Sequence, residues 1–431
     1  MVSILHLSDI HMGSGFCHGY INADTGLNTR LEDFVTTLSQ CVDRAIADDA
    51  DLVLFGGDAF PDATPPPLVQ QAFAGQFRRL ADARIPTVLL VGNHDQYAQG
   101  QGGASLCIYR TLGVPGVIVG DRLETHRIDT NHGPVQVVTL PWLTPSTLLT
   151  RPEMEGLSMA AVNQHLLDRL RVALEGEIRS LDPNIPAILL GHLMTDTAAY
   201  GAERFLAVGK GFMVPMAMLA RPCFDYVALG HVHRHQVLCK FPPVVYPGSI
   251  ERVDFSEADE EKGYVWAHVE RGSTTLEFCP LPVRSFTTVT VNLTTSDSPQ
   301  TDLLNALHQH SIQDAVVRVI YSIRPDQVDC LDQTTLYEAL SLSHTYTIHP
   351  QIVSQKARSR LPELATGNSL DPIDALQTYL ANREDLADLA QDMMAAAQAL
   401  LSDTPFEQTE VAEPSIVDEI PDQGSQQLRL L

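Results

Sequence analysis

The sequence predicts a layered α/β domain followed by smaller units toward the C-terminus. Short apolar runs alternate with segments of helical periodicity through the first half of the 431 residues. Each of the first three runs is soon followed by a glycine or an aspartate. Alternation of this kind is typical of a buried, mostly parallel sheet whose faces are covered by helices.

The elements of the first domain are predicted from these two periods. Strands are expected over residues 3–7, 52–55, 87–91, 135–140, 187–190 and 226–229. Between the first two strands, apolar residues recur at the i, i+3, i+4, i+7 spacing over 31–46, which predicts an amphipathic helix. A second such helix is expected over 68–80.

The pattern changes after residue 282. A small α/β unit over 283–355 is predicted from alternating extended and helical segments at 286–293, 301–310, 316–323, 336–342 and 345–353. Asp371 before Pro372 is a helix start, and helices are expected over about 372–381 and 384–401. Residues 402–431 hold seven acids and one base without periodicity, which predicts a flexible acidic tail.

Composition limits the class of protein. The chain is 44% hydrophobic, 19% charged and carries a net charge of −25, so it is globular and lacks the excess of cations that a broad nucleic-acid-binding face requires. Seven scattered cysteines without a CxxC pair indicate reduced thiols in the cytoplasm. We expect neither a secretory signal nor a membrane span.

Five short motifs with metal-binding residue types follow predicted strands. They are Ser8-Asp9-Ile10-His11, Gly56-Gly57-Asp58, Gly92-Asn93-His94-Asp95, Gly191-His192 and Gly230-His231-Val232-His233. Ligand sites of open α/β sheets lie beyond the carboxyl ends of the strands, so we expect the five to share one site. In extended chain, the i, i+2 spacing of the first and last motifs lets both members face one centre. Each motif alone is as readily a turn or surface feature; their joint order predicts the site.

The donor set indicates the kind of metal. Two carboxylates, an amide oxygen and four imidazoles suit Mn²⁺, Fe²⁺ or Zn²⁺ better than Ca²⁺, and the lack of thiolates argues against structural zinc. Seven side chains are too many for one ion, so we expect two ions that share Asp58. Two metals about 3.5–4 Å apart suit in-line displacement at phosphorus.

The five motifs together resemble the calcineurin-like metallophosphoesterase superfamily. Within it, the local sequences at 4–11, 226–233 and 246–252 are similar to the SbcD-type bacterial nuclease subunits. The resemblance covers 1–282 well and the next unit loosely. It implies an α/β/β/α metallophosphoesterase sandwich over 1–282, an α/β capping domain over 283–355, a helical partner-binding segment over 356–401, and leaves the tail over 402–431 uncovered.

The resemblance also implies residue roles. One metal would be held by Asp9, His11, Asp58 and His233, and the other by Asp58, Asn93, His192 and His231. His94 matches the catalytic histidine, Asp95 is expected to cap the turn, and the metals would be Mn²⁺, with Fe²⁺ or Zn²⁺ as alternatives. Some relatives carry a second histidine where this chain has Pro61, so nothing is implied for that position.

The function implied is that of an ATP-regulated DNA nuclease subunit in repair and recombination. It would act as a double-strand exonuclease and a single-strand or hairpin endonuclease, as a homodimer within a heterotetramer with an SbcC-like SMC-family ATPase. That ATPase would contact the C-terminal helices and supply cationic surface for DNA. The alternatives are a small-molecule phosphodiesterase or phosphatase and a non-catalytic scaffold. The helical stripe could instead pack on the cap, the cap could be a packing module, and the basic residues at 356–360 could be a solvated linker.

Overall fold

The computed structural model describes residues 1–97, 103–144, 156–201, 213–353, 372–381, 383, 386 and 389–401. The chain divides into two compact units, Met1–Val353 and Ser354–Leu431. None of the helices in the described residues combines the length and apolar character needed to cross a bilayer.

The first sheet of the larger unit has six strands in the order β14-β13-β1-β2-β3-β4. These strands are β1 (Val2–Leu7), β2 (Leu52–Phe55), β3 (Thr87–Leu90), β4 (Val117–Gly120), β13 (Gly263–Glu270) and β14 (Ser273–Pro280). β1 to β4 pair in parallel, whereas β13 and β14 are antiparallel to their neighbours. The carboxyl ends of β1, β2 and β3 therefore lie at one edge of the sheet.

The second sheet also has six strands, in the order β11-β12-β10-β7-β6-β5. Its strands are β5 (Glu124–Thr130), β6 (Gly133–Leu140), β7 (Ala187–His192), β10 (Tyr226–Gly230), β11 (Gln236–Lys240) and β12 (Pro243–Tyr246). The four central strands pair in parallel, and the antiparallel β5 and β11 form the edges.

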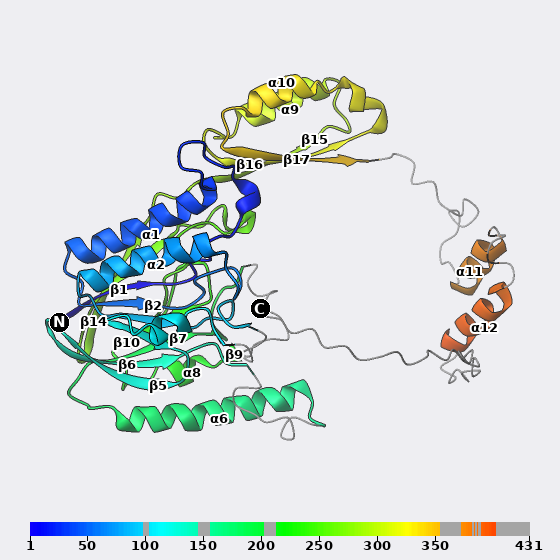
Figure 1. Ribbon diagram of the computed structural model, residues 1–431. Helices are drawn as coiled ribbons and strands as arrows, with labels where there is room; N and C mark the ends of the chain where they lie inside the picture. Colours follow the sequence, from blue (N-terminus) through cyan, green and yellow to red (C-terminus); the bar gives the residue numbers. More distant parts are fainter. Residues whose placement is uncertain are drawn as a thin grey trace, which may run out of the picture. The chain divides into compact units, whose positions relative to one another are not determined.

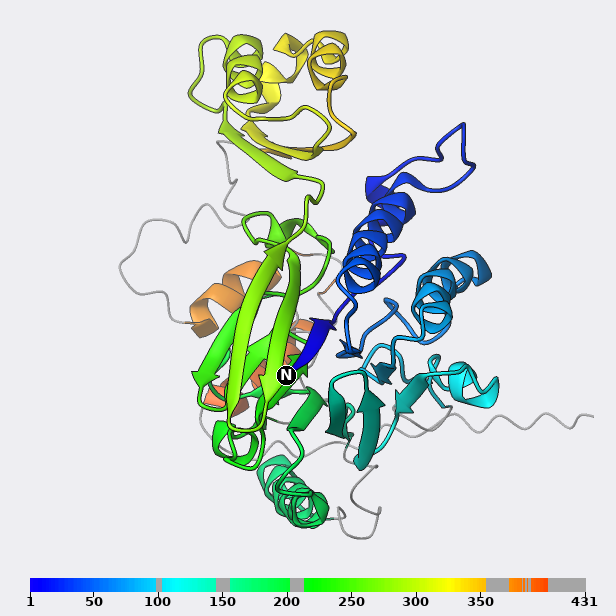
Figure 2. The same ribbon diagram turned by 90° about the vertical axis from the view of Figure 1, so that its left-hand side faces the viewer.

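Helices cover the outer face of each sheet, which confirms the predicted α/β/β/α sandwich (Figures 1 and 2). α1 (Thr29–Ala47) and α2 (Pro67–Asp82) pack Phe34 and Phe73 against Phe55 of the first sheet. α6 (Met159–Ser180) and the short α8 (Met216–Leu219) cover the second sheet. A third apolar layer joins the two sheets, with Ile4 and Ile188 fully buried in it.

A small α/β unit follows the sandwich. Its parallel sheet contains β15 (Phe286–Asn292), β16 (Val316–Ile323) and β17 (Thr345–Ile352). α9 (Pro299–His308) and α10 (Gln333–Leu340) lie on one face of that sheet (Figure 1). The guanidinium of Arg284 makes two hydrogen bonds to Asp33 of α1, at 2.8 and 2.7 Å, and thus ties the start of this unit to the sandwich.

The predicted elements are found with small shifts at their ends, and several others were missed. The missed elements are β4, β5, β11 to β14, α3 (Cys107–Thr111), α6, α8 and the two-stranded pair β8 (Met194–Thr195) and β9 (Met213–Val214). Edge strands such as β5 and β11 expose much of their length, so they lack the continuous apolar run of a central strand. α6 does carry a buried stripe of Val162, Leu166, Leu170 and Leu174 at four-residue spacing.

The second unit contains α11 (Pro372–Ala381) and α12 (Ala390–Leu401). The first of these has the predicted bounds. The prediction for the second was wrong at its start, because the helix begins at Ala390 and not at residue 384; Leu386 and Leu389 lie in 3₁₀ turns before it. The expected cap Asp371, the basic stretch at 356–360 and the tail at 402–431 lie outside the described residues.

Candidate metal centre

The five motifs follow β1, β2, β3, β7 and β10, and the structure brings them together between the carboxyl ends of the two sheets. Backbone hydrogen bonds join the loops: the Asp9 amide donates to the Gly57 carbonyl at 3.0 Å. The His231 amide donates to both carboxylate oxygens of Asp9 at 3.0 Å. Loops from different sheets are therefore held in one cluster.

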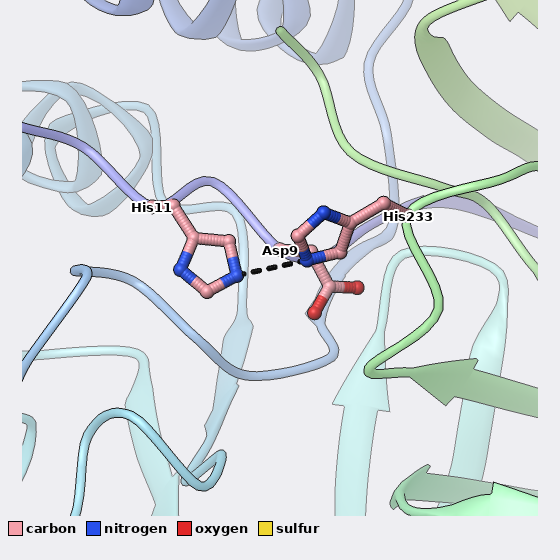
Figure 3. A group of neighbouring side chains, drawn as sticks. All are labelled: Asp9, His11 and His233. Carbon is pink, nitrogen blue, oxygen red and sulfur yellow. Dashed lines mark hydrogen bonds between the residues drawn. The ribbon is translucent and has the colours of Figure 1, made fainter. Parts of the chain in front are cut away.

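The candidate ligands form three overlapping groups whose donor atoms lie within 4.8 Å of one another. The groups are Asp9, His11 and His233; His11, Asp58 and His94; and Asp58, His192 and His231. His11 and Asp58 each belong to two groups, so the groups form one continuous cluster. Figure 3 shows the first group, in which the rings of His11 and His233 face one another beside the Asp9 carboxylate.

The chemistry around Asn93 fits a cation. Nδ1 of His192 lies 2.6 Å from the Gly56 carbonyl, so in the neutral ring Nδ1 donates and Nε2 carries the lone pair. That Nε2 lies 2.9 Å from Oδ1 of Asn93 and 3.3 Å from Oδ2 of Asp58. Nδ1 of His231 approaches the same Asn93 oxygen to 2.9 Å. Electron-pair donors that converge in this way require a positive charge between them, either a proton or a metal ion.

Electrostatics lead to the same conclusion. Burial alone would lower the pKa of His192, but the Asp58 carboxylate beside it outweighs burial and raises the pKa to about 9. The pKa of Asp58 moves well below its usual value because the attraction of His192 and other imidazoles exceeds the opposing effect of burial. Metal ligation requires a deprotonated imidazole, so an ion in this cluster would take the place of that proton.

The backbone of the loops is turned to aim the side chains inward. Seven non-glycine residues in the described part of the chain have positive φ, and four of them are candidate ligands: Asp9 (52°), His11 (46°), Asp58 (59°) and His231 (104°). Left-handed backbone is unfavourable for residues with a Cβ and concentrates at functional sites.

Two glycines make the close packing of the loops possible. A Cβ on Gly92 would lie 2.1 Å from Oδ1 of Asp58. A Cβ on Gly57, which has a φ of +98°, would lie 2.5 Å from Nδ1 of His192. The glycines before Asp58 and Asn93 are therefore required by the approach of backbone to the cluster.

The prediction that Asp95 caps its turn is confirmed. Its fully buried carboxylate accepts hydrogen bonds from the amides of Asp58 (2.9 Å), Ala59 (3.0 Å) and Gly92 (2.9 Å). It thereby ties the Gly-Asp loop to the Gly-Asn-His-Asp loop.

Replacing Asp95 by asparagine is expected to lower the free energy of unfolding by about 1–3 kcal/mol, because an amide NH₂ would face a backbone N–H. Chemical unfolding of the metal-free chain measures this. Asp329→Asn, at an exposed position, is the matched control and should leave stability unchanged. Equal stability of Asp95→Asn and the wild type would contradict the capping role.

His94 is half-buried and oriented by its neighbours. Its Nδ1 donates to the Pro61 carbonyl at 2.7 Å, and its backbone amide donates to Oδ1 of Asp58 at 2.9 Å. Its ring meets that of His11 edge-on, with the centroids 4.9 Å apart. Pro61 thus orients His94 through its backbone carbonyl, a contact that no side-chain motif reveals.

Two residues beside the cluster were missed from the sequence. Glu257 lies 24 residues after His233, in a 3₁₀ turn (η3, Phe255–Glu257), and its carboxylate is 2.6 Å from Nδ1 of His233. The Trp142 ring packs at 4.9 Å from that of His231. Neither follows a predicted strand within one of the five motifs, so no local pattern links them to the site.

Comparison with known families places the chain. A family model described as calcineurin-like phosphoesterase matches residues 2–235, more than half of the sequence. The chain belongs to this family, which implies a metal-dependent phosphoesterase.

Individual relatives narrow the comparison. The chain is 27% identical over 266 residues to SbcD, the smaller-lettered component of the nuclease SbcCD, from Escherichia coli strain K12 and from E. coli O157:H7. The alignment covers 60% of this chain and 63% of each relative, which is less than two thirds of their length. A crystal structure of a dimetal phosphatase from Danio rerio aligns with a TM-score of 0.37 and 12% identity, over 64% of this chain and 98% of that one.

Proposed function

We propose that this chain is the nuclease subunit of an ATP-regulated complex that hydrolyses DNA phosphodiester bonds with two divalent metal ions. The observation that carries the proposal is the gathering of seven oxygen and nitrogen donors around Asp58 at the junction of the two sheets. The 27% identity to the SbcD component of nuclease SbcCD supports the choice of DNA as substrate.

The donors divide naturally between two ions. One ion would be held by Asp9, His11, Asp58 and His233, and the other by Asp58, Asn93, His192 and His231. Mn²⁺ is the preferred metal, because imidazole, carboxylate and amide donors without thiolate suit it, and Fe²⁺ or Zn²⁺ would fit the same set. When bound, such a pair acts as a Lewis acid toward a phosphate ester and activates water.

His94 is the proposed catalytic residue. Because Nδ1 is engaged by the Pro61 carbonyl, Nε2 is the nitrogen that is left to act on substrate. A proton held there would be given to the departing oxygen of the DNA chain, a general-acid role. The peptide N–H of His94 keeps this residue beside Asp58, and so beside the phosphate.

The domains follow from the same proposal. Residues 1–282 would carry the chemistry, 283–355 would cap the site, and 356–401 would dock on an SbcC-like SMC-family ATPase, with 402–431 as a tail. The net charge of −25 favours a partner that supplies cationic surface for DNA. A homodimer within a heterotetramer, located in the cytoplasm, completes the proposal; all seven cysteines lie in the described residues and are free, which suits that compartment.

The test is hydrolysis with Mn²⁺ of blunt duplex and hairpin DNA against cyclic nucleotides and nucleotide esters. The chain should be assayed alone and with an SbcC-like ATPase, with and without ATP. We expect DNA to be cleaved, ATP and the ATPase to change the rate, and chelation by EDTA to stop the reaction. Hydrolysis of the small esters with DNA left intact in every combination would replace the proposal by a small-molecule phosphodiesterase.

A further inference from the structure

A buried acid–base pair lies behind the candidate ligand His233. Oε1 of Glu257 is 2.6 Å from Nδ1 of His233, on the side of the ring opposite the cluster. The other carboxylate oxygen, Oε2, is 2.8 Å from the ammonium of Lys262 and also accepts the Val253 amide at 3.0 Å. Both oxygens of Glu257 are thus engaged, one by the ring and one by its support.

Lys262 connects this support to His233 a second time. Its ammonium donates to the His233 carbonyl at 3.2 Å and pairs with Glu260 at 2.8 Å. Lys262 and Glu257 therefore hold His233 at both its ring and its backbone. The lysine side chain is 0% exposed and that of Glu257 is 7% exposed.

Such burial is costly. Two charges removed from water gain little net stability from one another, and a well-packed apolar pair would serve the fold as well. The geometry shows what the pair does in return. A neutral imidazole carries one N–H; with Glu257 accepting from Nδ1, the lone pair lies on Nε2, which faces Nε2 of His11 at 3.0 Å (Figure 3).

We propose that Glu257, held in place by Lys262, is a positioning residue that fixes the tautomer and ring orientation of His233 for metal binding. The inference rests on the proposed function, because it takes His233 as a ligand. Carboxylates behind ligating histidines increase ligand basicity, and their loss usually weakens metal affinity about 10–100-fold. The effect should be confined to the ion that His233 holds.

Glu260 provides a matched control. It pairs with the same ammonium at the same 2.8 Å, yet no described contact joins it to His233. Glu257→Gln and Glu260→Gln thus make the same chemical change and each remove one acidic partner of Lys262. Only the first removes the charge behind the ring.

Mn²⁺ binding to the full-length, metal-free chain, followed by calorimetry and electron paramagnetic resonance, tests the proposal. The wild type should bind two ions that give an exchange-coupled spectrum. Glu257→Gln should weaken one of the two sites about 10–100-fold and, at equal loading, give the spectrum of an isolated ion. Glu260→Gln should match the wild type in both measurements.

Wild-type affinities in Glu257→Gln, or equal losses in both variants, would overturn the positioning role. Nitrogen-15 spectra of the metal-free wild type, recorded where the rings are neutral, give an answer that needs no variant. They should show His233 protonated at Nδ1; a proton on Nε2 would overturn the proposal even if Glu257→Gln fails to fold. A wild type that binds no Mn²⁺ would instead refute the proposed function, and this inference with it.

Discussion

Replacing Asp58 by asparagine is expected to reduce Mn²⁺-dependent hydrolysis of DNA by about 10³-fold or more. Asp58 is the one carboxylate placed between the two halves of the cluster: its Oδ2 lies 3.7 Å from Nε2 of His11 and 3.3 Å from that of His192. Loss of its charge removes a shared ligand from both ions, and two-metal activation supplies several kcal/mol to phosphoryl chemistry.

Steady-state assays with the purified variant measure this loss, together with the number of Mn²⁺ ions bound per chain. Asp62→Asn is a matched control, because Asp62 is exposed on the same loop and bonds only to nearby Thr64 among the described contacts. It should keep wild-type activity and metal content. Undiminished hydrolysis by Asp58→Asn would refute a reaction centred on this cluster.

The second large effect is expected at His94. His94→Gln should lower kcat by about 10²–10⁴-fold, the range of a general acid or base, while both Mn²⁺ ions remain bound. The reason is geometric: Nδ1 is held by the Pro61 carbonyl, so the residue offers Nε2 to substrate rather than completing either ligand set.

Measuring rate and metal content on the same preparation separates catalysis from ligation. This matters because His94 also lies within 4.8 Å of donor atoms of His11 and Asp58. His165→Gln, on the exposed face of α6, serves as the control and should change neither quantity. A variant of His94 that loses an ion would make this residue a ligand; one that keeps full kcat would remove it from the mechanism.

The sequence predicted the meeting point of the five motifs because parallel topology determines it. Once residues 4–7, 52–55 and 87–90 are read as parallel strands, the residues that follow them must emerge at one edge. Spacing within a motif, as in Asp9 and His11, then indicates which side chains point together. These are local signals, and local signals are what a single sequence displays.

The supporting contacts could not be predicted in this way. Glu257 meets His233 only because a 3₁₀ turn after β12 folds back against the loop after β10. Pro61 orients His94 through a carbonyl that every residue possesses. The left-handed backbone at Asp9 and Asp58 likewise depends on tertiary packing, since neither residue type demands it.

Elements without a strong period were missed for a related reason. β14 alternates exposed and half-buried residues at the edge of its sheet and is specified by its pairing with β13 rather than by its own pattern. In the second unit, the stripe from Leu386 onward predicts one helix, whereas 3₁₀ turns at Leu386 and Leu389 precede α12.

The most direct test of the account is the position of metal in crystals of the full chain grown with Mn²⁺ and located by anomalous scattering. We predict two peaks about 3.5–4 Å apart, with the Asp58 carboxylate bound to both. A single peak, or two peaks of which only one contacts Asp58, would contradict a pair of ions built around that residue.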